Sequence, residues 1–210
     1  MRYCKSVPDL RAIVLCALLF WWPLHNAQAE GIVINKAEIR LTDEGYILAT
    51  EYQISLTFYV EQALIRGITL NFISEFRLTR SRWYWLDETI AKSEQSYKLS
   101  YNPLTRQYRI ARGTLFQNFD SLEEALTVLG HQTSSGIAPE LLHTKSNYLV
   151  SLVRREPGYS AYSRLSLDVS QLPKPLQVNA IAGDDWNLDS GGYTWVLTPA
   201  DIATARVAAP

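Results

Sequence analysis

The stretch YSAYSRLSLDV, residues 159–169, places apolar side chains at alternate positions along the chain. Successive side chains of an extended chain point to opposite faces. One face would therefore carry the apolar residues Tyr159, Ala161, Leu165, Leu167 and Val169. This pattern predicts a β-strand that buries one face.

The same period of two recurs along most of the chain. Residues 33–56 alternate on both sides of a turn at 42–45, and residues 97–110 alternate around the turn pair Asn102 and Pro103. We expect a hairpin from each segment, further strands at 70–78 and 148–154, and a last hairpin over 186–197 that turns at 189–192. The fold class predicted is mainly β, an antiparallel β-sandwich (immunoglobulin-like or related) with two short helices.

Two segments have helical signals instead. Residues 59–66 are followed by Gly67, a residue that accepts the left-handed conformation at a helix end. Ser121 and Glu124 form a capping box, and apolar residues at helical spacing follow until Gly130. These signals predict the two helices, whereas the polar residues 131–145 are expected to form a loop or lid.

Two prolines stand one residue apart in LPKPLQV, residues 172–178. In an extended segment Pro173 and Pro175 would leave two gaps in the hydrogen-bond donors of one edge, so that edge could not extend a sheet. We therefore expect an extended segment at a sheet border that delivers Leu176 and Val178 to the core. Trp186, beyond it, is expected to belong to the same structural motif as the prolines.

The first residues have the features of a targeting segment. A basic front precedes an apolar run over residues 12–22, and Ala27 and Ala29 supply a small-x-small cleavage site. We expect residues 1–29 to be a signal peptide, 30–198 a single β-rich domain and 199–210 a disordered tail. The apolar run is about half of the roughly 20 residues that span a bilayer, which argues against a permanent membrane span. The predicted location is the periplasm or the exterior after cleavage.

Cysteine and charge content restrict the function classes. Both cysteines, Cys4 and Cys16, lie in the expected leader, so the mature chain would have no disulfide and no cysteine-ligated metal. Without the leader, the 20 basic and 21 acidic residues become 17 and 20, a formal charge of −3. This near balance argues against nucleic acid or another polyanion as the partner.

One candidate interaction surface stands out, where charge alternates with aromatic rings. Its residues are Arg80, Arg82, Trp83 and Trp85. A single-stranded nucleic-acid groove uses such a pattern, but burial of the tryptophans behind solvated arginines, or an exposed aromatic ridge that binds a protein, are the alternatives. The sequence does not choose between buried and exposed rings.

Two weaker patterns concern metal binding and catalysis. Asp185, Asn187 and Asp189 imitate the start of a calcium loop, yet Ser190 and Val196 occupy the places of its glycine and its glutamate. His131 and His143 are the histidines left after export, and no nucleophile-elbow pattern accompanies the nearby serines. We therefore predict no catalytic residue, no bound metal and no cofactor.

Four motifs in order resemble a known bacterial family. They are RSRWYWLDE at 80–88, LSYNPLTRQYRI at 99–110, SLEEAL at 121–126, and RLSLDVSQLPKPLQV at 164–178 followed by Asp185 and Trp186. Together they are similar to domain-of-unknown-function family 4390, whose members are sometimes called proline-rich signal peptide proteins. The resemblance covers about residues 32–195. It implies an exported protein with no established activity, cofactor or catalytic residue, often encoded beside a sensor histidine kinase.

The function expected is therefore a non-enzymatic binding module of the cell envelope. Its partner would be an envelope protein, with the periplasmic domain of a sensor kinase as one candidate. The alternative is an envelope hydrolase or metal-dependent binder that uses His131 and His143 or residues 185–189. A third alternative is a carrier with a cavity between two sheets.

Overall fold

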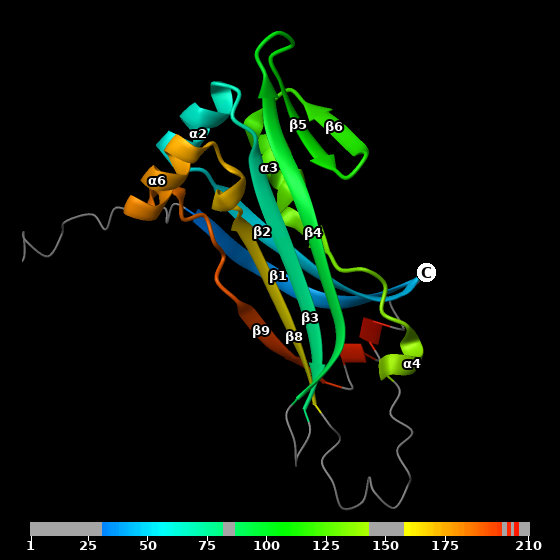
Figure 1. Ribbon diagram of the computed structural model, residues 1–210. Helices are drawn as coiled ribbons and strands as arrows, with labels where there is room; N and C mark the ends of the chain where they lie inside the picture. Colours follow the sequence, from blue (N-terminus) through cyan, green and yellow to red (C-terminus); the bar gives the residue numbers. More distant parts are fainter. Residues whose placement is uncertain (1–30, 82–86, 143–157, 199–200, 203, 206–210) are drawn as a thin grey trace, which may run out of the picture.

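The computed structural model describes residues 31–81, 87–142, 158–198, 201–202 and 204–205, and within them the strands form two antiparallel sheets (Figure 1). One sheet has three strands in the order β1-β2-β7, and the other has six in the order β6-β5-β4-β3-β8-β9. The mainly β, antiparallel, two-sheet fold predicted above is confirmed. The expected leader 1–29 and the expected strand 148–154 lie outside the described residues.

The three-stranded sheet is built on the predicted first hairpin. Strands β1 (Gly31–Thr42) and β2 (Gly45–Ser55) pair around a two-residue turn, and β7 (His131–Thr133) adds to the other side of β2. Gly45 has a φ of 112°, and a Cβ atom there would lie 2.4 Å from the carbonyl oxygen of Ile137. Only glycine fits this turn, because the conformation and the space both exclude a side chain.

The six-stranded sheet contains the stretch that predicted the fold. Strand β8 (Tyr159–Leu167) has β3 on one side and β9 on the other, and every second residue is buried, as predicted. The second predicted hairpin is also confirmed, with the rings of Tyr101 and Tyr108 4.8 Å apart across it. The strands of this sheet are β3 (Leu70–Arg80), β4 (Glu88–Asn102), β5 (Gln107–Arg112), β6 (Leu115–Phe119), β8 and β9 (Tyr193–Leu197).

Both predicted helices are present. Helix α2 (Phe58–Ile65) begins after Thr57, and α3 (Leu122–Gly130) begins after Ser121, whose hydroxyl accepts from the Glu124 amide at 3.2 Å. Helix α3 packs against β2 and reaches β5 and β6, so it continues the layer of the smaller sheet. The predicted loop 131–145 instead contains β7 and the single turn α4 (Pro139–Leu142).

The prediction of an extended proline segment is wrong. Residues Lys174–Ala182 form helix α6, and the Pro173 carbonyl accepts from the amides of Leu176 and Gln177. Both prolines lie at the helix start, where backbone N–H groups have no acceptor within the helix, so their missing donors cost nothing. Figure 1 shows α6 beside α2 at one end of the molecule. Leu176 is partly buried as expected, whereas Val178 is 67% exposed.

The prediction of a last hairpin over 186–197 is also wrong. Trp186 ends a short 3-10 helix, η2 (Asp184–Trp186), and is buried in the core, while β9 pairs with β8. A second 3-10 helix, η1 (Val169–Gln171), follows β8. In the expected disordered tail, residues 201–202 and 204–205 are helical, and Ala205 is buried. Ala205 belongs to one of the two core clusters, and Ile202 packs against it.

The core has two apolar clusters with hydroxyl side chains at the level between them. Thr50, Ser74 and Ser163 occupy inward positions of β2, β3 and β8 where the alternation would otherwise place apolar residues. The hydroxyl of Tyr52 contacts Ser163 Oγ at 2.5 Å, and Thr50 Oγ1 lies 3.3 Å from the same atom. Burial raises the pKa of Tyr52. These contacts join the two sheets at their centre.

Gly130 provides a test of the close approach between α3 and β2. A Cβ atom at Gly130 would lie 2.2 Å from the Tyr52 carbonyl oxygen, so Gly130→Ala should lower the free energy of unfolding by about 3 kcal/mol through overpacking. Gly158→Ala is the matched control, because its Cβ would meet nothing within 4 Å, and its effect should stay below about 0.5 kcal/mol. Urea unfolding measures both. Equal stability of the two variants would contradict the packing.

Candidate binding groove between strands β1 and β9

A groove of about 560 Å³ lies between the outer strand of each sheet. Its walls come from residues 37–41 of β1 and from Trp195 and Leu197 of β9, and the helical residues Asp201, Thr204 and Ala205 complete it. Ile39, Leu197 and Ala205 are buried, and Leu41 and Trp195 pack against them. The groove therefore has an apolar floor that is continuous with the core.

One edge of β1 is not paired with any strand among the described residues, and the register with β2 shows which backbone groups lie on that edge. Tyr46 and Leu48 of β2 direct their backbone bonds away from β1, to Ile137 and Ser134. Opposite them in the register are Leu41 and Ile39, and Ala37 follows opposite Thr50. Residues alternate in the side to which they direct N–H and C=O groups. The backbone groups of Ala37, Ile39 and Leu41 thus point out of the sheet toward the groove side, where the described residues offer them no strand.

The same reasoning applies to β9. The Ser190 amide donates to the Leu165 carbonyl, and the Leu167 amide donates to the Leu188 carbonyl. The odd-numbered residues of β8 therefore direct their backbone groups to the side on which β9 lies. Trp195 and Leu197, which lie opposite Ala161 and Tyr159, therefore bond to β8. The residues between them, Thr194 and Val196, direct their backbone groups outward. Two open edges, one from each sheet, consequently border the groove.

Trp195 has an unused donor beside the groove. Its indole Nε1 is buried and makes no hydrogen bond, although buried indole N–H groups usually find an acceptor. The ring stacks on Tyr193, with ring centroids 5.7 Å apart, and Tyr193 is 44% exposed. An aromatic pair with an unused donor thus lies on the inner side of the edge strand.

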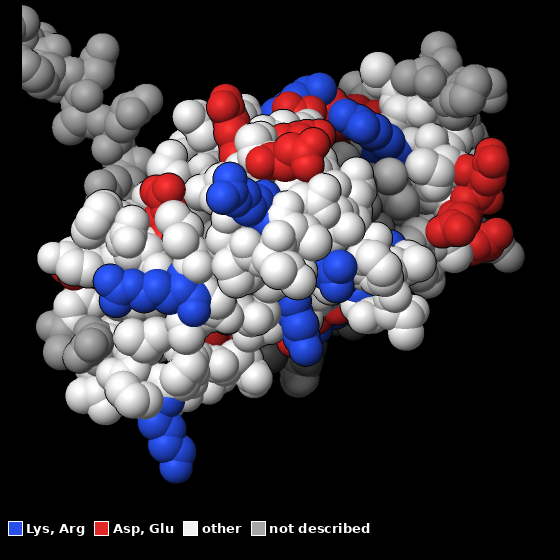
Figure 2. All heavy atoms as spheres, turned by 90° about the horizontal axis from the view of Figure 1, so that it is seen from above, with Lys and Arg blue, Asp and Glu red and all other residues white. Residues whose placement is uncertain are grey.

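The charged groups near the groove compensate one another. Glu38 pairs with Lys36 at 2.8 Å and with Arg40, and these hydrogen bonds hold the pKa of the Glu38 carboxyl below its ordinary value. Asp201 accepts from the amide and hydroxyl of Thr198, both at 2.8 Å, which lowers its pKa. Figure 2 shows acidic and basic side chains also interspersed on the end of the molecule that is seen from above. This groove is therefore suited to an uncharged ligand surface.

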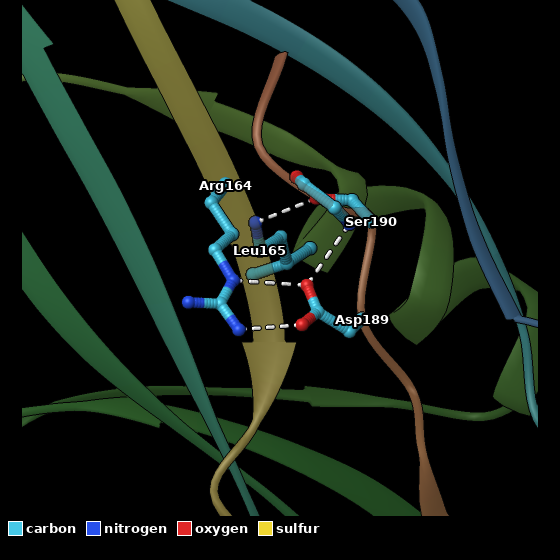
Figure 3. A network of polar contacts seen from close by, with 5 residues as sticks. Arg164, Leu165, Asp189 and Ser190 are labelled. Carbon is cyan, nitrogen blue, oxygen red and sulfur yellow. Dashed lines mark hydrogen bonds and ion pairs between the residues drawn. The ribbon is translucent and has the colours of Figure 1, made fainter. Parts of the chain in front are cut away.

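A polar clamp holds the segment before β9 against β8 (Figure 3). Arg164 donates to both carboxylate oxygens of Asp189, at 3.0 and 2.5 Å, and the Leu165 amide donates to Ser190 Oγ at 2.9 Å. The hydrogen bond from Arg164 lowers the pKa of Asp189, with a further contribution from the Gly191 amide. This clamp fixes where β9 begins and therefore where one wall of the groove lies.

The described members of the predicted site are not among the residues that line this groove. Arg80 Nη2 donates to the Leu141 carbonyl at 3.1 Å and the guanidinium lies over the Tyr159 ring, whereas its buried Nε has no hydrogen-bond partner among the described residues. Arg82, Trp83 and Trp85 lie outside the described residues. Pro173 and Pro175 are exposed at the start of α6, and the Trp186 ring is buried in the core.

The residues of the metal and hydrolase alternatives are also dispersed. Asp185 and Asn187 are exposed, whereas the carboxylate of Asp189 is engaged by Arg164. His131 is exposed and its Nδ1 lies 2.7 Å from the Thr127 carbonyl, while His143 falls outside the described residues. Over the part of the chain that the structure describes, no three His, Cys, Asp or Glu side chains form a group that could hold a metal ion. No helix in that part has the length and apolar character needed to cross a membrane.

Sequence reasoning missed the groove although one signal was present. The alternation places Tyr193, Trp195 and Leu197 on one face of a strand, and Ala37, Ile39 and Leu41 on one face of another. That these two faces meet at open edges follows from the strand order, which the alternation does not encode.

The clamp gives a pH-dependent prediction. Asp189→Asn should lower the free energy of unfolding by about 1 kcal/mol at neutral pH, because the ion pair is bidentate but partly solvated. The pKa of Asp189 is lowered in the folded state, so its stabilisation is present above about pH 4 and is lost as the pH falls through the folded value. Urea unfolding at pH 7 and at about pH 2.5 should show the difference between wild type and variant shrinking in acid.

The matched control for this measurement is Asp185→Asn. The Asp185 side chain is exposed, so its replacement should change stability by less than about 0.5 kcal/mol at pH 7. A difference for Asp189→Asn that is unchanged in acid would contradict a stabilising ionised Asp189.

Comparison with known proteins agrees with the resemblance seen in the motifs. The family model described as "Domain of unknown function (DUF4390)" matches residues 29–196, which include both sheets except Leu197, the last residue of β9. No curated protein and no solved structure matches the chain. Because the match covers most of the 210 residues, the chain belongs to the DUF4390 family.

Proposed function

We propose that the protein is a non-enzymatic binding module of the cell envelope and that its binding site is the groove between β1 and β9. The observation that carries the proposal is the meeting of two open strand edges over an apolar floor, beside the unused indole donor of Trp195. Open edges and unused buried donors are costly features in a protein without a partner. A ligand that covers them would remove both costs.

The protein acts, in this proposal, after export and removal of residues 1–29. The basic front, the apolar run and the Ala27-x-Ala29 site support export, and the mature chain without cysteine suits any redox environment. The partner is another envelope protein. The periplasmic domain of a sensor kinase is the first one to test, because the family resemblance implies a protein often encoded beside such a kinase.

Cleavage of the leader can be tested directly. In a bacterial host, the wild-type chain should accumulate as a protein that begins at Glu30, whereas replacement of Ala27 and Ala29 by lysine should leave the precursor intact, because the cleavage site requires small residues there. Gln28→Ala is the control and should be processed normally. Intact-mass measurement of the envelope fraction distinguishes the forms. A wild-type protein that keeps residues 1–29 would contradict the proposal.

The location of the binding site can be tested by photocrosslinking in intact cells. The photoreactive residue p-benzoylphenylalanine should replace Tyr193, which is 44% exposed beside Trp195. The control position is Phe116, an aromatic residue that is 63% exposed on β6, at the opposite edge of the same sheet. A discrete adduct is expected from the position of Tyr193 and not from that of Phe116.

Dependence on the groove is the second part of this test. Trp195→Ala removes the ring next to the crosslinker and should reduce the adduct, because the apolar wall and the indole donor are both lost. Equal adducts from both positions, or an adduct that does not depend on Trp195, would contradict a binding site in the groove.

A further inference from the structure

We infer that the ligand of the groove is an extended segment of a partner protein, which pairs with the open edge of β1 as an additional strand. This inference rests on the proposed function and specifies its ligand. Strand addition to an open sheet edge is a general mode of peptide recognition, in which backbone bonds give affinity and alternate side chains give specificity. Three features of β1 favour this mode over a ligand without a peptide backbone.

The first feature is a regular run of backbone groups that no strand among the described residues pairs with. The register of β1 against β2 is interrupted between Ile34 and Lys36 and is then continuous to Thr42. Within this run Ala37, Ile39 and Leu41 each present an N–H and a C=O group to the open side, at the spacing of a strand ladder. An extended peptide matches this row of donors and acceptors.

The second feature is that proline and a bulge, two features that commonly block an edge strand, are missing from the same run. The irregularity of β1 lies before the run, and residues 36–42 contain no proline. The charged Lys36, Glu38 and Arg40 alternate with Ala37, Ile39 and Leu41, and Glu38 and Arg40 also line the groove. The backbone of the run is therefore regular enough to pair with a strand.

The third feature is what the groove offers to the side chains of an added strand. Alternate residues of that strand would point to the floor formed by Ile39, Leu197 and Ala205, and those between them would point to solvent. The Trp195 ring, which lines the groove, would contact an apolar side chain of that strand. The ion pairs of Glu38 are already closed, so the segment that fits is neutral and alternates apolar with polar residues.

Strand β9 also has an open edge, but it offers fewer groups. Thr194 and Val196 are its outward residues, and the chain then turns where Asp201 caps Thr198. The longer regular run of β1 can bond a longer segment. The preference for β1 over β9 makes the inference testable with proline, which removes one N–H group without changing the number of strands.

The experiment selects peptides on the mature protein and then removes single edge donors. The probe is a phage-displayed library of random segments of about eight residues, the length of an ordinary strand. Ala37→Pro removes an outward N–H group of β1, and Val196→Pro is the matched variant on the β9 edge. Selected peptides should alternate apolar and polar residues, bind about ten-fold or more weakly to Ala37→Pro, and bind normally to Val196→Pro.

Folding and hydrogen exchange provide the controls. The urea unfolding midpoint of Ala37→Pro should remain near that of wild type, and Leu41→Pro serves as a second variant of the same edge if it does not. Amide exchange of residues 37, 39 and 41 should slow when a selected peptide binds, since their N–H groups then acquire acceptors. Trp195→Phe, which keeps a ring but removes the donor, should weaken binding less than Trp195→Ala.

Several results would overturn the inference. Two concern the peptides: selected sequences that do not alternate apolar and polar residues, and peptides that bind wild type and Ala37→Pro equally or lose binding only to Val196→Pro. Another is self-association of the mature protein through β1 in sedimentation. The last is slower amide exchange of the groove residues when dodecanoate, a fatty acid without a peptide backbone, binds with equal strength to wild type and Ala37→Pro. Each of these can occur together with a Trp195-dependent crosslink at Tyr193. In that case the proposed binding function would be retained, and strand addition to β1 would be rejected.

Discussion

The buried contact between Tyr52 of β2 and Ser163 of β8 joins the two sheets, and the position of both outer strands depends on it. Strand β2 is the middle strand of the smaller sheet, and β8 has β3 and β9 as neighbours. With β2 over β8, β7 lies toward β4, where Gln95 donates to the Thr133 carbonyl. The remaining strand β1 then lies on the side of β9.

The unequal widths of the sheets explain why a groove exists there. Three strands cannot cover six, and helix α3 extends the smaller layer toward β5 and β6. At the opposite side both layers end together, at β1 and β9, and Asp201, Thr204 and Ala205 line the groove between them. The clamp between Arg164 and Asp189 keeps β9 in this place. The groove is therefore a consequence of where two sheets stop and not of a dedicated loop.

Several predictions that depend on local sequence signals are confirmed. The alternation from Tyr159 to Leu167 and the capping hydroxyl of Ser121 each depend on residues a few positions apart, and both are confirmed. The prediction of an extended segment at Pro173 and Pro175 was wrong, because a residue without a backbone N–H group fits a sheet edge and the first turn of a helix equally well. The hydrogen bonds from Leu176 and Gln177 to the Pro173 carbonyl decide for the helix.

The candidate site could be predicted only in part. The sequence by itself determined which residues of β1 and β9 share an apolar face, because the side-chain period of a strand is a local property of the backbone. Only the tertiary structure decided that Ile39 and Trp195 border one groove and that no strand formed by the described residues pairs with the edge at Ala37 to Leu41. The reason is physical: the hydrogen-bond partners of an edge are supplied by distant segments, whose order in the sheets no local pattern records.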